Sequence, residues 1–248
     1  MSANDDKTLA THASAIAATP ACGAEIPAPD ADFSAREAMV RTIDQCFARY
    51  ARMPETGSLS PRVRDAMLAV PRHLFVPEQD RARAYLNLPV PIGYGQTISQ
   101  PFIVALMTEL LHLAPGARVL EIGTGCGYQT AILSRLAQHV FSMEIVAPLA
   151  ERAARTFSDL GLPNVTTRIG DGHRGWPDEA PFDAVLVAAA PARVPEALVR
   201  QLRPGGRLVL PVGESAQQLI VVEMRSDQSS VQREIIPVCF VPLTSEDV

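Results

Sequence analysis

Glycines and an acidic residue near the middle of the chain have the spacing of a ligand-binding turn. An apolar run, 118–122, contains Glu121 and opens into the sequence GTGCG at 123–127. A ligand can approach such a turn closely because glycine has no side chain, and a helix that follows offers unpaired N–H groups. The pattern therefore predicts a nucleoside-binding loop at the end of a strand.

The glycine spacing favours S-adenosylmethionine over a dinucleotide as the ligand. A dinucleotide loop needs G-x-G-x-x-G, and here Tyr128 stands at the third glycine position, so that the pattern is G-x-G-x-G. S-adenosylmethionine has no phosphate and presents two cationic groups, which suits Glu121. Glu144, about twenty residues on, could accept hydrogen bonds from both ribose hydroxyls, but NAD would use the same contact. An NAD-dependent oxidoreductase therefore stays an alternative.

A third acidic residue, Asp171, stands between Gly170 and Gly172 after a further apolar segment. At the same sheet edge its carboxylate could accept a hydrogen bond from an adenine amino group. An aspartate between glycines is also typical of a turn, and both interpretations stay open.

The overall composition is that of a soluble globular protein, with 47% hydrophobic and 20% charged residues. A net charge of -5 gives no general reason to bind nucleic acid or an anionic membrane, and no segment predicts a membrane span. The cysteines are scattered, as are the histidines, which predicts no metal site and a reducing compartment, the cytoplasm.

Three regions are expected along the chain. Residues 1–33 contain few large apolar residues and predict a disordered tail. Residues 34–97 predict a helical and irregular subdomain: a capping box at Ser34 and Glu37 starts one helix, Ser60 caps a second, and 74–97 is dense in proline and glycine. Residues 98–248 form the predicted ligand-binding core.

In that core, strand and helix patterns alternate. We expect strands at 118–122, 140–145, 165–169 and 184–188, separated in part by helices at 102–113, after Gly127 and at 148–160. A helix ending at Leu202 and a turn at 205–206 precede closing strands at 207–212, 218–224 and 231–241. Such alternation predicts an α/β fold with a doubly wound, mostly parallel sheet that is covered on both faces.

Several motifs resemble those of the protein-L-isoaspartate (D-aspartate) O-methyltransferase family. They are PIGYGQTISQP at 91–101, VLEIGTGCGYQT at 119–130, VPRHLFVP at 70–77 and GDG at 170–172, and further matches follow in the family's order up to Thr244. The resemblance implies a Rossmann-like class I methyltransferase fold.

The resemblance also implies roles for individual residues. Ser99 would be the active-site hydroxyl and, with Gln96, Thr97 and Ile98, would lie beside the cofactor. The remaining cofactor contacts would be Glu121, Gly123, Gly125, Cys126 and Gly127 at the methionine moiety, Glu144 at the ribose, Asp171 and Gly172 at the adenine, and Thr244. Val104 stands where eukaryotic members often have a histidine.

The implied activity is transfer of a methyl group from S-adenosylmethionine to the free carboxylate of L-isoaspartyl, and in some cases D-aspartyl, residues of damaged proteins and peptides. The products would be S-adenosylhomocysteine and an ester that closes to a succinimide, which starts repair; a monomer is expected to suffice. A carboxylic acid with a pKa of about 4 is already ionised, so no general base is needed. Ser99 would hold the carboxylate near the start of the helix that contains Pro101, unless it only caps that helix.

Two alternatives keep the cofactor. The acceptor could be a small molecule or a dedicated biosynthetic peptide, or the chain could bind S-adenosylmethionine without catalysis. The intact sequence Thr97-Ile98-Ser99 argues against binding without catalysis, because a protein that only binds the cofactor would not need it.

Overall fold

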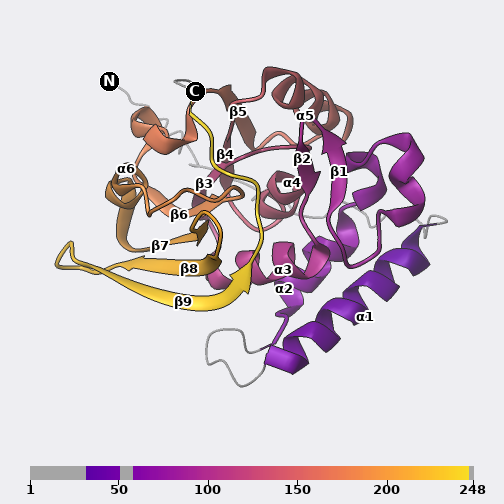
Figure 1. Ribbon diagram of the computed structural model, residues 1–248, viewed down its shortest axis with the longest axis horizontal. Coiled ribbons are helices and arrows are strands. Elements are labelled where there is room, and N and C mark those ends of the chain that lie inside the picture. Colours follow the sequence, from indigo (N-terminus) through magenta and orange to yellow (C-terminus); the bar gives the residue numbers. More distant parts are fainter. Residues whose placement is uncertain (1–31, 51–57, 246–248) are drawn as a thin grey trace, which may run out of the picture.

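The molecule is built around a seven-stranded sheet whose strand order is β5-β4-β3-β6-β7-β8-β9. The structure is a computed structural model and describes residues 32–50 and 58–245. Strands β5, β4, β3, β6 and β7 run parallel to one another, whereas β8 is antiparallel to β7 and β9 is antiparallel to β8. The predicted α/β fold with a mostly parallel sheet is confirmed (Figure 1). Of the predicted tail, 1–33, all but Asp32 and Phe33 lie outside the described residues.

The bounds of the strands at the centre of the sheet are close to those predicted. Their bounds are β3 Arg118–Ile122, β4 His139–Glu144, β5 Val165–Ile169, β6 Phe182–Val187, β7 Leu202–Val212, β8 Gln217–Met224 and β9 Ser230–Val238. The prediction that Leu202 ends a helix is wrong, because Leu202 begins β7. The predicted turn at 205–206 is also not a boundary between a helix and a strand: both glycines lie within β7, where its pairing with β6 shifts register between Phe182–Leu202 and Ala184–Arg207.

Six α-helices surround the sheet in the described residues. They are α1 Phe33–Tyr50, α2 Pro61–Ala69, α3 Pro101–Leu110, α4 Tyr128–Ser134, α5 Ala147–Asp159 and α6 Glu196–Arg200. Ser60 caps α2, since its hydroxyl accepts a hydrogen bond from Val63 N at 3.3 Å, as predicted. The predicted capping box is wrong, because Ser34 lies inside α1 and the carbonyl of Asp32 accepts the first helical bond, from Arg36 N.

The segment 74–97, predicted to be irregular, contains regular elements. Two 3₁₀ helices, η1 Arg72–Phe75 and η2 Glu78–Arg83, precede a hairpin of β1 Val90–Gly93 and β2 Gln96–Ile98. Gly93 and Gly95 have φ angles of 92° and 71°, so they allow the tight turn between these short strands. Glycines that predicted a loop here therefore serve the turn of a hairpin.

Alternate residues of each strand enter two separate apolar layers. Val119, Val140 and Ala184 pack in the larger layer, which also includes buried side chains of helices α1 to α5. Their neighbours Leu120 and Phe141 pack in the smaller layer, which includes side chains of α6 and the segment before β6. This two-sided burial explains why the central strands are almost continuously apolar. In the described part of the chain, every helix is too short or too polar to cross a lipid bilayer.

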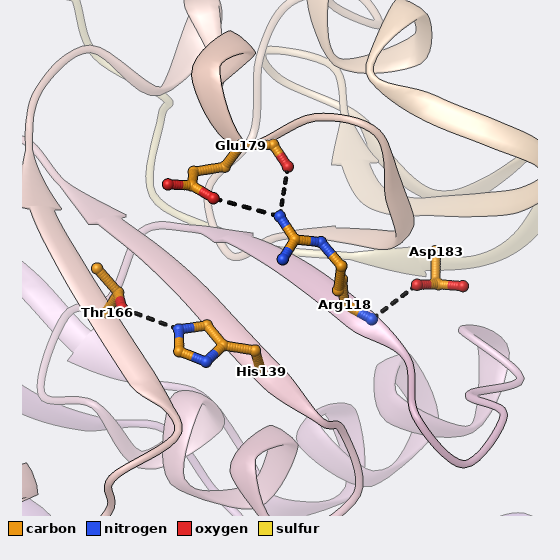
Figure 2. Close-up of polar contacts among 5 residues, drawn as sticks. All are labelled: Arg118, His139, Thr166, Glu179 and Asp183. Atoms are coloured by element: carbon orange, nitrogen blue, oxygen red, sulfur yellow. Dashed lines mark hydrogen bonds and ion pairs between the residues drawn. The ribbon is translucent and has the colours of Figure 1, made fainter.

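Polar contacts join neighbouring strands at the amino-terminal edge of the sheet (Figure 2). Arg118 N on β3 donates to the Asp183 carboxylate on β6 at 2.7 Å, and the Arg118 guanidinium donates to the carbonyl of Glu179. A ring nitrogen of His139 on β4 lies 2.8 Å from the hydroxyl of Thr166 on β5. These side chains are used in contacts with one another, so we assign this edge a structural role.

We predict that Asp183→Ala destabilises the fold by about 1–3 kcal/mol, because it leaves a backbone N–H and a guanidinium without their acceptor. The Asp183 carboxylate accepts from Arg118 N and pairs with Arg203 Nε at 2.7 Å. The free energy of unfolding in urea measures the loss. Asp178→Ala is the matched control: its carboxylate is 85% exposed and 3.9 Å from Arg168, so little change is expected. Equal losses in both variants would contradict the structural role.

Candidate functional site

A cavity lies at the carboxyl ends of β3, β4 and β6, where the strand order reverses. It encloses about 780 Å³, its opening included, and is lined by residues of several segments: the glycine-rich loop, the end of β4, Gly170 and Gly172, Ala188 and Ala189, the β1–β2 hairpin and the C-terminal segment. Ligands of doubly wound sheets bind at this topological position. The fold alone therefore marks the cavity as the candidate site.

The glycine-rich loop is fixed to the end of the neighbouring strand. Gly123 N donates to the carbonyl of Met143 at 2.8 Å, and Gly125 N donates to the Glu144 carboxylate at 2.7 Å. Gly127 does not line the cavity. It has a φ of 91°, and a Cβ there would lie 2.5 Å from the ring of Phe157, so glycine allows α4 and α5 to pack closely.

Glu144 lines the cavity with a carboxylate held in one orientation. One oxygen accepts from Gly125 N at 2.7 Å and the other from Val146 N at 2.9 Å. Each carboxylate oxygen has two acceptor lone pairs, so both can still accept from a ligand hydroxyl. The geometry fits a ligand with two adjacent hydroxyl groups.

Glu121 lies beneath the loop and does not line the cavity. Its side chain is fully buried and accepts hydrogen bonds from Thr130 on α4 at 2.5 Å and from Ser142 on β4 at 2.7 Å. Ser142 is also 2.6 Å from Thr124 of the loop. The second oxygen, Oε1, has no hydrogen-bond partner, and burial raises the pKa of Glu121 to about 7. The structure thus places Glu121 in a hydroxyl network that supports the loop.

Asp171 takes the turn position that one interpretation of its sequence favoured. Its carboxylate accepts from His173 N at 2.9 Å and lies 3.0 Å from His173 Nδ1, so it caps the short 3₁₀ helix η3 Gly172–Arg174. Gly170 and Gly172 line the cavity on either side of it, and Asp171 does not.

The predicted loop at 96–99 lies at the opposite wall of the cavity. Gln96, Thr97, Ile98 and Ser99 all line it. The alternative that Ser99 only caps α3 is wrong, because Gln100 is the N-cap residue and makes no side-chain cap bond.

The start of α3 is less open than its sequence suggests. Phe102 N, which has no acceptor within the helix, donates to Asn87 Oδ1 at 3.0 Å. The helix start therefore offers fewer free N–H groups beside Ser99 than the position of Pro101 suggested.

A second cavity adjoins the first across the Ser99 loop. Four residues line both: Thr97, Ser99, Ala188 and Val241. Its other walls are mostly apolar and include Phe102, whose ring stacks on Tyr50 at 5.4 Å, and the segment 236–240 after and within β9.

The C-terminal segment closes one side of both cavities. In Figure 1 this segment, drawn in yellow, runs back from the end of β9. It is held by two bonds at 2.8 Å, from Ala190 N to the Val241 carbonyl and from Leu243 N to the Ala190 carbonyl. This pairing places Thr244 at the first cavity, where the sequence analysis expected it.

Sequence reasoning missed several lining residues. They include Ala188 and Ala189 after β6, Val146 after β4, and Val241, Pro242 and Leu243 in the C-terminal segment. The first two could have been found from their position, because they follow the strand that pairs with β3. The described residues contain no group of three or more His, Cys, Asp or Glu side chains that could hold a metal ion.

Comparisons with known proteins agree on one family. A model of the family described as protein-L-isoaspartate(D-aspartate) O-methyltransferase matches residues 51–248. Protein-L-isoaspartate O-methyltransferase 2 of Syntrophobacter fumaroxidans is 48% identical over 227 residues, which cover 90% of this chain and 92% of the relative. Protein-L-isoaspartate O-methyltransferase of Anaeromyxobacter dehalogenans is 57% identical over 191 residues, covering 76% of this chain and 91% of the relative.

Solved structures of similar proteins have the same fold. A protein-L-isoaspartate O-methyltransferase superposes with a TM-score of 0.71 at 28% identity, covering 83% of this chain and 66% of the other. A Plasmodium falciparum protein described as a putative protein-L-isoaspartate O-methyltransferase, in complex with S-adenosyl-L-homocysteine, has a TM-score of 0.69 at 25% identity, covering 83% and 98%.

We predict that Glu121→Gln reduces the pH dependence of stability. In the wild type the folded pKa, about 7, is above the ordinary 4.5, so the stabilising contribution of the protonated carboxyl is complete below 4.5 and is lost as pH rises through 7. The amide of the variant would stay neutral and keep one acceptor oxygen. We therefore expect the free energy of unfolding of the variant, relative to that of the wild type, to be higher at about pH 8.5 than at about pH 5, by up to about 3 kcal/mol. Urea unfolding at the two pH values measures it.

Glu151→Gln, at an exposed position of α5, serves as the control and should show no such gain. The same difference from wild type at both pH values would mean that Glu121 does not titrate in this range.

Proposed function

This chain belongs to the protein-L-isoaspartate (D-aspartate) O-methyltransferase family, and on that premise we propose that its two adjoining cavities hold S-adenosylmethionine and an isoaspartyl residue. The enzyme transfers a methyl group from S-adenosylmethionine to the free carboxylate of L-isoaspartyl residues in damaged proteins, which begins their repair. The nitrogen of the following backbone amide attacks the carbonyl carbon of the methyl ester more readily than that of a carboxylate, and methanol leaves as the succinimide ring closes. Hydrolysis of the succinimide can then give normal aspartate.

The lining of the first cavity suits S-adenosylmethionine. Among its described lining residues are the carboxylate of Glu144 and the backbone of the glycine-rich loop, but no Arg, Lys or His. Cationic side chains or a helix N-terminus usually bind a pyrophosphate. The start of α4 lies at this cavity, but a carboxylate in the wall and no cationic side chain in the described lining favour a sulfonium and an ammonium group. When bound, S-adenosylmethionine supplies an electrophilic methyl group. The side chains present therefore support this cofactor over NAD.

We assign the cofactor contacts as follows. Glu144 binds the ribose hydroxyls, Gly172 the adenine, and Gly123, Gly125 and Cys126 the methionine moiety. Asp171 caps η3 beside Gly172 and is not assigned a contact, because it does not line the cavity. Gln96, Thr97, Ile98, Ser99 and Thr244 complete the walls. Glu121 and Gly127 support the loop from behind, because neither lines the cavity.

The observation that carries the proposal is that Ser99 lines both cavities. A methyl group on the cofactor side and a carboxylate on the acceptor side can meet only where the cavities join. The Ser99 hydroxyl would donate a hydrogen bond to one carboxylate oxygen and leave the other aligned with the methyl group. Bringing two reactants into such a geometry can lower a barrier by several kcal/mol.

The acceptor cavity fits a segment of a protein chain. Its walls are mostly apolar side chains and backbone from α1, α3 and the end of β9, with one stacked aromatic pair, Tyr50 and Phe102. We propose that the protein acts as a monomer. The three cysteines that the structure describes are free, which supports a reducing compartment, and we propose the cytoplasm.

We predict that Ser99→Ala lowers kcat/KM for an isoaspartyl peptide by about 100-fold, the usual effect of removing one donor to the reacting group. The assay compares methyl incorporation into the isoaspartyl peptide and its aspartyl counterpart. The wild type should methylate the first only, and Ser99→Ala should bind S-adenosylhomocysteine with unchanged affinity. Ser158→Ala, exposed on α5, is the control.

Wild-type activity of Ser99→Ala would remove this hydroxyl from the mechanism. A wild type that does not distinguish the two peptides would indicate another acceptor, such as a small molecule or a dedicated peptide.

We predict that Glu144→Gln weakens binding of S-adenosylhomocysteine by about tenfold or more, because a neutral amide is a poorer acceptor than a carboxylate. Calorimetric titration measures the dissociation constant. Glu151→Gln should bind as the wild type does. A thermal melt of the free protein is needed as well, since Glu144 also accepts from Gly125 N and Val146 N. Unchanged affinity in a folded variant would contradict the ribose contact.

A further inference from the structure

Arg72 is a fully buried cation directly behind the Ser99 loop. It belongs to η1, and its side chain has no exposed surface. Its Nη2 donates to the backbone carbonyl of Ser99 at 2.7 Å, and its Nε donates to the carbonyl of Ala84 at 2.7 Å. The guanidinium therefore fixes the backbone of the residue that faces the acceptor.

The same guanidinium reaches the cofactor side of the site. Its central carbon lies 4.8 Å from the centre of the Tyr128 ring, and Tyr128 is the first residue of α4, after the glycine-rich loop, and lines the first cavity. Arg72 thus connects the acceptor loop to the end of the cofactor loop through one planar group.

The charge of Arg72 is not balanced by a carboxylate. It forms no ion pair within the described residues, and its Nη1 is buried without a hydrogen-bond partner. Burial lowers the pKa of Arg72 from its ordinary value, and the groups that oppose this effect are Tyr128, Cys126 and Tyr85. An arginine remains protonated even so. A buried charge without a partner is costly, so an anion nearby would be strongly favoured.

We propose that Arg72 is a positioning residue that holds the Ser99 backbone in place and supplies the positive charge that attracts the substrate carboxylate to the acceptor cavity. The proposal rests on the proposed function, because the anion in question is the isoaspartyl carboxylate beside Ser99. A purely structural role, in which Arg72 only ties Ala84 to Ser99, makes a different prediction.

The test compares two peptides in the presence of saturating S-adenosylhomocysteine, so that no turnover occurs. One peptide carries isoaspartate, and the other is identical except that the free carboxylate is a neutral carboxamide. The ratio of their dissociation constants reports how much the site favours the charge. A change in the protein that acts through packing alone weakens both peptides and leaves this ratio unchanged, and a change that only displaces the Ser99 hydroxyl lowers the ratio no further than Ser99→Ala does.

For the wild type we expect the carboxylate peptide to bind about tenfold or more tightly than the carboxamide, as buried charge pairs do. Arg72→Met retains most of the apolar stem and removes the charge, and it should bring the ratio close to one. Arg72→Lys keeps the charge but loses the planar fork, so it should retain most of the ratio while kcat falls.

Arg62→Met is the matched control. Like Arg72, Arg62 lines neither cavity and donates to two backbone carbonyls, those of Leu113 at 2.7 Å and Leu136 at 3.1 Å, but neither of these acceptors lines the site, whereas Ser99 does. Its loss should leave the ratio at the wild-type value.

The proposal is overturned if Arg72→Met weakens both peptides equally. It is also overturned, without any variant, if the wild type binds the two peptides equally well, which keeps the test decisive should Arg72→Met not fold. Failure of the proposed function would look different, since the wild type would then not methylate the isoaspartyl peptide or would not bind S-adenosylhomocysteine.

Discussion

The hydrogen bond from Gly125 N to the Glu144 carboxylate, 2.7 Å long, is the contact on which the site depends. Parallel pairing of β3 with β4 sets Ile122 opposite Met143, so the residues that follow each strand meet at the same edge. The loop after β3 then wraps around the side chain that ends β4. One carboxylate thereby fixes the position of the loop and also presents acceptor oxygens to the cavity.

The hydroxyl network below the loop shows how a buried acid can serve a site that it does not line. Glu121 connects β3, β4 and α4 through Thr130 and Ser142, and Ser142 extends the network to Thr124 in the loop. Hydrogen bonds from hydroxyls favour the ionised carboxylate, but complete burial opposes it more strongly, and the pKa rises to about 7. A cationic ligand above the loop would act in the direction of the hydroxyls, so its binding and the ionisation of Glu121 support each other.

The sequence predicted the centre of this fold well and its periphery less well. The bounds of β3 and β5 are as predicted, because each is a short run that begins after a turn and is followed by a glycine. The β1–β2 hairpin was missed, since its strands are too short to show a period and its glycines are equally typical of a loop. The burial of Glu121 could not be predicted either: it depends on α4 covering that face of β3, which a strand pattern alone does not contain. The burial of Arg72 could not be predicted either, because the carbonyls to which it donates, those of Ala84 and Ser99, are 12 and 27 residues away in the sequence.

The charges around the two proposed sites match the reaction. The first cavity, where we propose that S-adenosylmethionine binds, has a carboxylate in its wall and, in the described lining, no cationic side chain, whereas the fully buried guanidinium of Arg72 lies behind Ser99, which lines both cavities. A sulfonium and a carboxylate that met in water would each be strongly hydrated, and removing that water would oppose their approach. Fixed groups of the opposite sign on each side replace the water at no cost of reorganisation during the reaction. The methyl transfer then removes both charges at once, so the neutral ester is held less firmly than the carboxylate from which it came.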